Sequence, residues 1–193
     1  PFIETLSPML LVNKEVVFPT GIMFETSMER ENNTTVTMLC DLMTGSITHH
    51  NPYPETYRKH NWGGGFFYRT VHMCRGLDAN SVVLSFPADE RLWEFNLSTH
   101  TLTAHEGACQ SVSSIKPFKE TKELISDNPE NAVEDWYYSQ DNYEGVFSDP
   151  YRNLYYRIGR LAVEETPSGF NNKGVVIAAY DRDFSYLGET VLP

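Results

Sequence analysis

The stretch NWGGGFFYRT (61–70) combines residue types that are suited to ligand binding. Its three glycines allow close approach of the backbone to another molecule and permit positive φ angles. Trp62 and Tyr68 offer aromatic surfaces, and Arg69 offers a planar cation with several hydrogen-bond donors. Such a set suits a sugar, a peptide or an aromatic ligand. The alternative is a connection between two sheets whose aromatic side chains pack between them.

A second candidate is SDPYRNLYYR (148–157). Its candidate ligand-binding residues are Asp149, Arg152, Tyr156 and Arg157. An Asp–Arg pair across a hairpin is alternatively a salt bridge that stabilises the turn. Strand alternation places Tyr155 and Arg157 on one face and Tyr156 on the other. A buried Arg157 needs an acidic partner, for which Asp149 is the nearest candidate in the sequence.

Contiguous catalytic signatures are absent from the sequence. The chain lacks the G-x-S-x-G, H-E-x-x-H, Walker and G-x-G-x-x-G patterns, so we assign no catalytic residue and expect no cofactor. DRDFS (181–185) begins like a calcium loop, but Tyr186 replaces the required glycine and Leu192 the final acid. His50 and His105 occupy equivalent places in a repeat, which favours surface positions on outer strands over metal ligation. We therefore expect no metal site.

Charge and composition exclude several classes of partner. The formal net charge is −11 at pH 7, which argues against a nucleic-acid groove and against electrostatic docking on anionic lipid. Eight acids and one lysine within 120–144 carry −7 of that charge. The segment 117–142 is therefore predicted to be a solvated acidic insertion, with a cation-binding or partner-docking face as the alternative. Asn128-Pro129-Glu130 is typical of a helix start, which predicts helix within 117–141.

The elements that position these residues are indicated by an internal repeat. CDLMTGSITHH (40–50) and FNLSTHTLTAH (95–105) share one pattern at a constant offset of 55 residues. In each copy a strand ends at Asp41 or Asn96, a polar turn follows, and a second alternating strand begins. The Asx side chain at that corner is suited to bonding the backbone of the turn. A weaker third copy has Asp181 at the corner and Leu187 in the place of Ile47 and Leu102.

Another hairpin precedes each copy, with turns predicted at 13–14, 78–80 and 149–152. The chain is thus predicted to contain three units of four antiparallel strands, at about 6–54, 66–110 and 143–193. Units of this size and strand number are typical of β-propeller blades. The alternative is one β-sandwich of about twelve strands, which does not require a repeat at fixed offset. We favour an all-β partial propeller that forms a single domain over 1–193.

Three blades cannot close a ring, since propellers usually have about four to eight. The outer faces of the end blades should then be apolar and bare, and such faces associate. We therefore expect the chain to be about half of a larger propeller, or to pair with another polypeptide. It begins at PFIETL without Met, so we expect a mature or truncated product.

Two stretches carry a resemblance to a known family: VFSDPYRNLYYRI (146–158) and VVIAAYDRDFSYLGETVL (175–192). With the hairpin rhythm, they resemble the C-terminal half of an uncharacterised six-bladed β-propeller family of Bacteroidota envelope lipoproteins, of the TolB-like propeller class. The resemblance implies an exported, lipidated precursor and a propeller about twice this length. It implies a place in the cell envelope, periplasmic or attached to the outer membrane surface. It supplies no activity for any residue.

Two main functional classes remain open from the sequence. The first is a non-enzymatic ligand- or protein-binding scaffold of the bacterial cell envelope. The second is a propeller hydrolase or lyase acting on a glycan or peptide, because such sites need no contiguous motif. A structural half-propeller inside a larger assembly is a third possibility. Expected partners are the missing blades or a partner chain that closes the ring, and envelope proteins, a glycan or a peptide.

Overall fold

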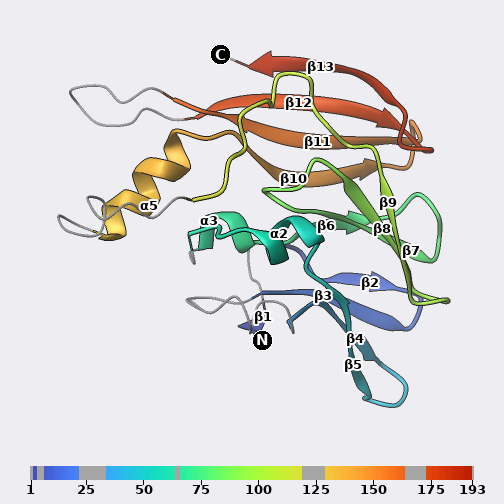
Figure 1. Ribbon diagram of the computed structural model, residues 1–193. Coiled ribbons are helices and arrows are strands. Elements are labelled where there is room, and N and C mark those ends of the chain that lie inside the picture. The colour runs from blue at the N-terminus through green and yellow to red at the C-terminus, as the bar shows by residue number, and fades with distance from the viewer. Residues whose placement is uncertain are drawn as a thin grey trace.

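The chain folds into three antiparallel β-sheets stacked on one another, with few helices (Figure 1). The computed structural model describes residues 2–3, 7–21, 34–63, 66–118, 129–163 and 173–192. Each sheet contains four strands that neighbour one another in chain order. In the first sheet, a two-residue strand, β1, also pairs with one end of β3.

The strands follow the predicted units closely. The first sheet contains β1 (Phe2–Ile3), β2 (Leu10–Val12), β3 (Glu15–Gly21), β4 (Thr35–Asp41) and β5 (Ile47–Pro52). The second contains β6 (His72–Arg75), β7 (Ser81–Ser85), β8 (Leu92–Asn96) and β9 (Thr101–His105). The third contains β10 (Asn142–Asp149), β11 (Leu154–Leu161), β12 (Gly174–Asp181) and β13 (Tyr186–Leu192). The three sheets, each made of two consecutive hairpins, confirm the predicted repeat.

The Asx corners act as the sequence predicted. The Oδ1 atom of Asp41 accepts hydrogen bonds from the backbone amides of Met43 and Thr44, at 2.7 and 2.9 Å. Asn96 Oδ1 accepts bonds from the amides two and three residues later, at 2.9 and 3.1 Å. Asp181 Oδ1 accepts bonds from Asp183 and Ser185, so this carboxylate stabilises a turn. The same local chemistry therefore shapes the last turn of every sheet.

The third hairpin corrects one predicted equivalence. Tyr180, which precedes the Asx corner, pairs with Tyr186 and not with Leu187. In the first and second copies, Cys40 pairs with Ile47 and Phe95 with Leu102. Tyr186 therefore holds the place that we had given to Leu187. The third turn is one residue shorter, and a register shift between Ala179 and Tyr180 restores the pairing.

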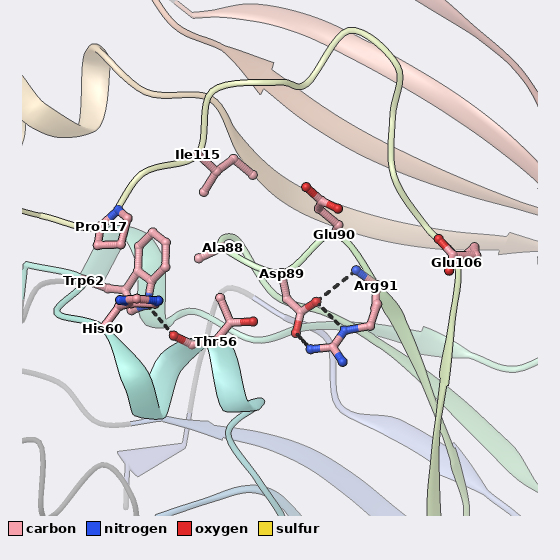
Figure 2. A pocket seen from close by; sticks show the side chains of 10 residues that line it. All are labelled: Thr56, His60, Trp62, Ala88, Asp89, Glu90, Arg91, Glu106, Ile115 and Pro117. Atoms are coloured by element: carbon pink, nitrogen blue, oxygen red, sulfur yellow. Dashed lines mark hydrogen bonds and ion pairs between the residues drawn. The ribbon is translucent and has the colours of Figure 1, made fainter.

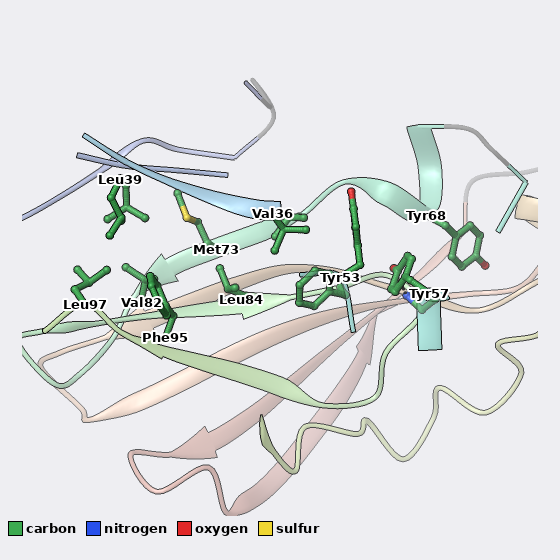
Figure 3. Packing of buried hydrophobic residues seen from close by; sticks show 14 of the residues in the cluster. Val36, Leu39, Tyr53, Tyr57, Tyr68, Met73, Val82, Leu84, Phe95 and Leu97 are labelled. Carbon is green, nitrogen blue, oxygen red and sulfur yellow. Dashed lines mark hydrogen bonds between the residues drawn. The ribbon is translucent and has the colours of Figure 1, made fainter. Parts of the chain in front are cut away.

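Two hydrophobic cores fill the spaces between the sheets. Val36 and Leu39 of the first sheet pack over Val82, Leu84 and Phe95 of the second (Figure 3). The other face of the second sheet carries residues such as Val83 and Leu92, which belong to the core shared with the third sheet. Both faces of the second sheet are thus covered, and all five residues of β7 are buried.

The helices lie together at one end of the stack, opposite the Asx turns (Figure 1). They are α2 (Glu55–Lys59), α3 (Phe66–Arg69) and α5 (Pro129–Tyr138). Helix α5 confirms the expected helix, with Pro129 in its first turn, whereas Asn128 and residues 119–127 lie outside the described residues. Residues 66–69 fall within the predicted second unit, but they form α3, and the sheet begins at His72.

Each end sheet turns an apolar face away from the stack. In β11, Tyr155 and Arg157 are buried toward the second sheet, so the alternate residues Tyr156 and Ile158 point outward. Phe147, paired with Tyr156, is 54% exposed. On the first sheet, the register Leu11–Val16–Cys40–Ile47 forms a similar outward row. Leu11 is 60% and Ile47 56% exposed.

Candidate functional site

A cavity of about 430 Å³ opens at the helical end of the stack (Figure 2). Three segments form its walls: the connection between the first two sheets, the β7–β8 loop, and the connection between the last two sheets. The lining residues are Thr56, His60, Trp62, Ala88, Asp89, Glu90, Arg91, Glu106, Ile115 and Pro117. The cavity is therefore built from connecting segments that the stacked sheets bring together.

An Asp–Arg pair occupies the charged side of the cavity. The Arg91 guanidinium donates to both carboxylate oxygens of Asp89, at 2.9 and 2.8 Å, and the Arg91 amide also donates to Asp89. Asp89 is 3% exposed, whereas the Arg91 side chain is 39% exposed. Hydrogen bonding to Asp89, with the nearby charges of Asp89, Glu55 and Glu106, raises the pKa of Arg91. The guanidinium also lies over the Trp93 ring, 4.6 Å from its centre.

Arg157 fixes the loop beneath that pair. Its guanidinium is fully buried and donates to the carbonyls of Glu90 and Gly107, both at 2.6 Å. It also donates to the carbonyls of Asp89, at 2.7 Å, and Phe86, at 3.4 Å, and Nε donates to Ser85 Oγ at 3.1 Å. These bonds use all five N–H groups of the side chain. A residue of the third sheet thus holds the backbone on two sides of the cavity.

The expected partnership between Arg157 and Asp149 is wrong. Asp149 instead accepts a 2.7 Å bond from Arg152 and two bonds from backbone amides of its own turn. Backbone carbonyls satisfy Arg157, and the Tyr143 ring lies 3.5 Å from its guanidinium carbon. Burial lowers the pKa of Arg157. The prediction was wrong because carbonyl dipoles from distant segments stabilise the Arg157 cation, so that it does not need a carboxylate partner.

Two carboxylates hold the 110–114 stretch, which leads into the third wall. Glu189 accepts bonds from the amides of Gln110 and Ser111, at 2.7 and 2.8 Å, and from the Ser111 hydroxyl. Asp141, which is 5% exposed, accepts bonds from the amides of Ser113 and Ser114, both at 2.8 Å. Its other oxygen accepts a bond from the Ala162 amide. Side chains from the third sheet and the residue before it therefore fix this wall as well.

The described residues of the glycine-rich candidate segment are largely buried, and Gly64 and Gly65 lie outside the described residues. Trp62, Tyr68 and Arg69 are 3%, 0% and 4% exposed. The Trp62 and Tyr68 rings stack at 5.5 Å, and Trp136 of α5 packs on Tyr68 at 4.6 Å. Burial raises the pKa of Tyr68, whose hydroxyl donates to the Asp141 carbonyl. The segment joins two sheets, as the alternative interpretation held, and of the three candidates Trp62 lines the cavity.

The second candidate segment lies away from this cavity. Asp149 and Arg152 form a salt bridge within one exposed turn, at the end opposite the helices. Tyr156 lines a groove of about 310 Å³ on the outward face of the third sheet. The structure therefore separates the seven candidate residues into a buried connection, an exposed turn, an outward face and a buried cation.

The charged cavity residues were missed by the sequence interpretation. Asp89, Glu90 and Arg91 lie in the short FPADERLW segment, which has no motif and no repeat equivalent. One signal was available: an Asp-x-Arg pair between two strands suits a local ion pair. The approach of Asp89, Glu90 and Arg91 to Glu106 depends on the stacking of the sheets.

Among the described residues, no group of three or more His, Cys, Asp or Glu side chains is placed to hold a metal ion. In the same part of the chain, no helix has the length and apolar character needed to cross a bilayer.

The fold and cavity define an all-β protein of stacked four-stranded sheets with a site among their connections. The chain belongs to the family described as Domain of unknown function (DUF4221), whose sequence profile matches residues 5–191. It is similar to a solved structure, the crystal structure of a DUF4221 member from Bacteroides vulgatus, with a TM-score of 0.71 and 17% identity. The match covers 97% of this chain but 52% of the other. No curated protein matches the chain.

Proposed function

We propose that the chain forms three consecutive blades of a larger β-propeller that serves as a non-enzymatic binding scaffold. Further four-stranded sheets of the same kind cover the outward faces of the first and third sheets of this chain. The sequential antiparallel order in every sheet supports this proposal, as does the close approach of the first strands, with β10 packing on β6. A binding role is favoured because a cavity of about 430 Å³ lies among connections, where propellers present variable surfaces.

The apolar outward faces carry the proposal. On the third sheet, Tyr156, Ile177 and Leu192 share a groove, and Leu192 is 40% exposed. On the first sheet, Leu11 and Ile47 lie at the two ends of an outward row of side chains. This row packs against no other sheet within the described residues. Apolar patches of this kind mark interaction sites. The family member from Bacteroides vulgatus is about twice as long as the segment matched here, which leaves room for further sheets.

Sedimentation equilibrium of the chain alone tests the exposed faces. We expect self-association at micromolar concentrations, because no other sheet is present to cover them. Ile177→Lys should weaken this association by placing a charge in the outward groove. Glu134→Lys, on the exposed side of α5, is the matched control and should leave association unchanged. A strictly monomeric chain at about 200 µM argues against apolar interfaces on these faces.

Intact mass from the native source distinguishes how the ring is completed. A polypeptide near twice 22.1 kDa indicates that the further sheets are on the same chain. A mass of 22.1 kDa requires a second polypeptide or copy for closure. A 22.1 kDa chain that remains alone in its native preparation overturns the proposal.

We also propose a place in the bacterial cell envelope, as the resemblance implies. Lipoprotein attachment and a six-bladed ring belong to this same proposal. Fractionation of the source cells should place the protein with the envelope, and globomycin should block maturation of a lipidated precursor. Recovery in the cytosolic fraction alone contradicts this location.

A further inference from the structure

The cavity at the helical end has an apolar side and an acidic side. Ala88, Ile115 and Pro117 lie along the apolar side, next to the Trp62 ring (Figure 2). Glu90 and Glu106 lie across from them and are exposed, near the Asp89–Arg91 pair. At about 430 Å³ the space is large enough for one long side chain with some solvent.

The charges in the cavity favour a cation. Asp89 neutralises Arg91 by a two-bond contact, so this pair contributes little net charge. Glu90 and Glu106 remain on the same side, and neither forms a salt bridge within the described residues. The whole chain is also strongly acidic, at −11. Two carboxylates, Glu90 and Glu106, therefore outnumber the single cation behind the loop, Arg157, so this side attracts a positive group and repels an anion.

Charged side chains behind the cavity hold its walls in place. Arg157 bonds four carbonyls around the β7–β8 loop and Gly107. Asp141 and Glu189 bond four amides of the 110–114 stretch. Placing Arg157 and Asp141 in the interior costs desolvation, which a passive surface hollow does not require, whereas Glu189 is half-buried. A preformed binding site needs walls that residues outside the cavity hold in position.

We infer that this cavity binds a basic side chain, lysine or arginine, presented by a peptide. The aliphatic stem lies against Ala88, Ile115 and Pro117, and the cationic end lies between Glu90 and Glu106. The Asp89–Arg91 pair keeps the loop in place, and the carboxylates of Glu90 and Glu106 repel acidic peptides. This inference names the ligand class for the proposed binding role and is independent of how the ring is closed.

NMR titration with three capped tripeptides tests the inference directly. The probes are acetyl-Ala-Lys-Ala-amide, the norleucine analogue without the charge, and the glutamate analogue. We expect the lysine peptide to bind with a millimolar Kd, since one side chain makes few contacts, and to shift the amides of 88–91 and 106. The norleucine and glutamate peptides should bind at least about tenfold more weakly.

A charge-matched pair of variants separates local from overall electrostatics. The double variant E90Q/E106Q should weaken lysine-peptide binding about tenfold, because both carboxylates at the cationic end are lost. E134Q/D135N removes the same charge from the exposed side of α5 and should bind like the wild type.

Three outcomes overturn the inference. They are equal binding of lysine and norleucine peptides, preferred binding of the glutamate peptide through Arg91, and no binding of any peptide at about 10 mM. Because the titration uses the chain by itself, failed binding leaves the ring-closure proposal standing. A monomeric chain in sedimentation equally leaves the peptide result valid.

Discussion

At the scale of single residues, Arg157 is the side chain on which most of the site depends. It crosses from the third sheet to the second and satisfies its five donors almost entirely with backbone carbonyls. Neither a lysine nor an apolar side chain reproduces that geometry, since lysine has only three donors on one atom. Arg157 therefore links the packing of two sheets to the shape of the cavity.

Replacing Arg157 with Met should destabilise the protein by on the order of 3 kcal/mol. The carbonyls of Asp89 and Glu90 lose their Arg157 donor, and the Gly107 carbonyl keeps only the bond from Tyr180. Urea denaturation measures the change. Arg152→Met, at an exposed salt bridge, should reduce the stability far less than Arg157→Met does. Equal stability of the two variants would show that the carbonyl bonds contribute little.

His72 should make stability depend on pH. Burial lowers the pKa of His72 to about 4, with Glu144 raising it and Arg157 lowering it by smaller amounts. The unfolded chain takes up a proton near pH 6.5, whereas the folded chain resists protonation until about pH 4. The stabilisation is therefore complete above pH 6.5 and is lost as the pH falls toward 4, by about 3 kcal/mol at most.

Chemical denaturation between pH 7 and 4 measures this dependence. His72→Gln should flatten the curve, because the non-titrating side chain removes the difference in proton uptake. His60→Gln should retain the wild-type slope, because His72 is still present. An unchanged slope in His72→Gln assigns the acid sensitivity to other groups.

At the scale of elements, the approach of β8 to the segment after β9 sets the width of the cavity. A Cβ atom at Gly107 would lie 2.7 Å from the Leu92 backbone nitrogen and 3.0 Å from the Glu90 carbonyl oxygen. Only a glycine lets these two backbones meet at this distance. The carbonyl of the same residue accepts bonds from Arg157 and from the Tyr180 hydroxyl.

Gly107→Ala should therefore cost about 2 kcal/mol or more and displace the wall that carries Glu106. Gly174→Ala is the matched control, since the nearest atom to its added Cβ lies at 3.6 Å. Thermal unfolding measures the stability of both variants, and the peptide titration reports on the wall. Tolerance of Gly107→Ala with unchanged peptide binding contradicts a tight contact between the two walls.

The sequence predicted the elements whose causes are local. The Asx turns at Asp41, Asn96 and Asp181 depend on a side chain and the next few amides, so their pattern is visible in the sequence. The partners of Arg157 lie 50 to 72 residues away, and all but the Ser85 hydroxyl are backbone carbonyls, which carry no residue-type signal. Helices α2 and α3 were missed because they are only five and four residues long. Their formation depends on tertiary packing.

At the scale of the whole molecule, the second sheet lies between the other two and is the most protected. All residues of β7 are buried, whereas β5 is mostly exposed along its length. Local opening should therefore need the least free energy at the outer strands and the most in the middle of the stack.

Hydrogen–deuterium exchange should show this gradient. We expect the amides of β7 to exchange slowest, at the rate of global unfolding, and those of β5 and β13 to exchange faster. Covering the outward faces with further sheets should slow exchange in the first and third sheets and leave β7 unchanged. Equal protection in all three sheets of the isolated chain contradicts the proposed exposure of the end sheets.

The way Arg157 holds the β7–β8 loop has a consequence for divergence of the binding site. The arginine contacts main-chain carbonyls at Phe86, Asp89 and Glu90, and these atoms are the same whatever side chains the loop carries. Substitutions at Glu90 can thus alter the chemistry of the cavity while the loop keeps its path. A scaffold of this kind is open to changes in specificity, by selection or by design, at little risk to folding.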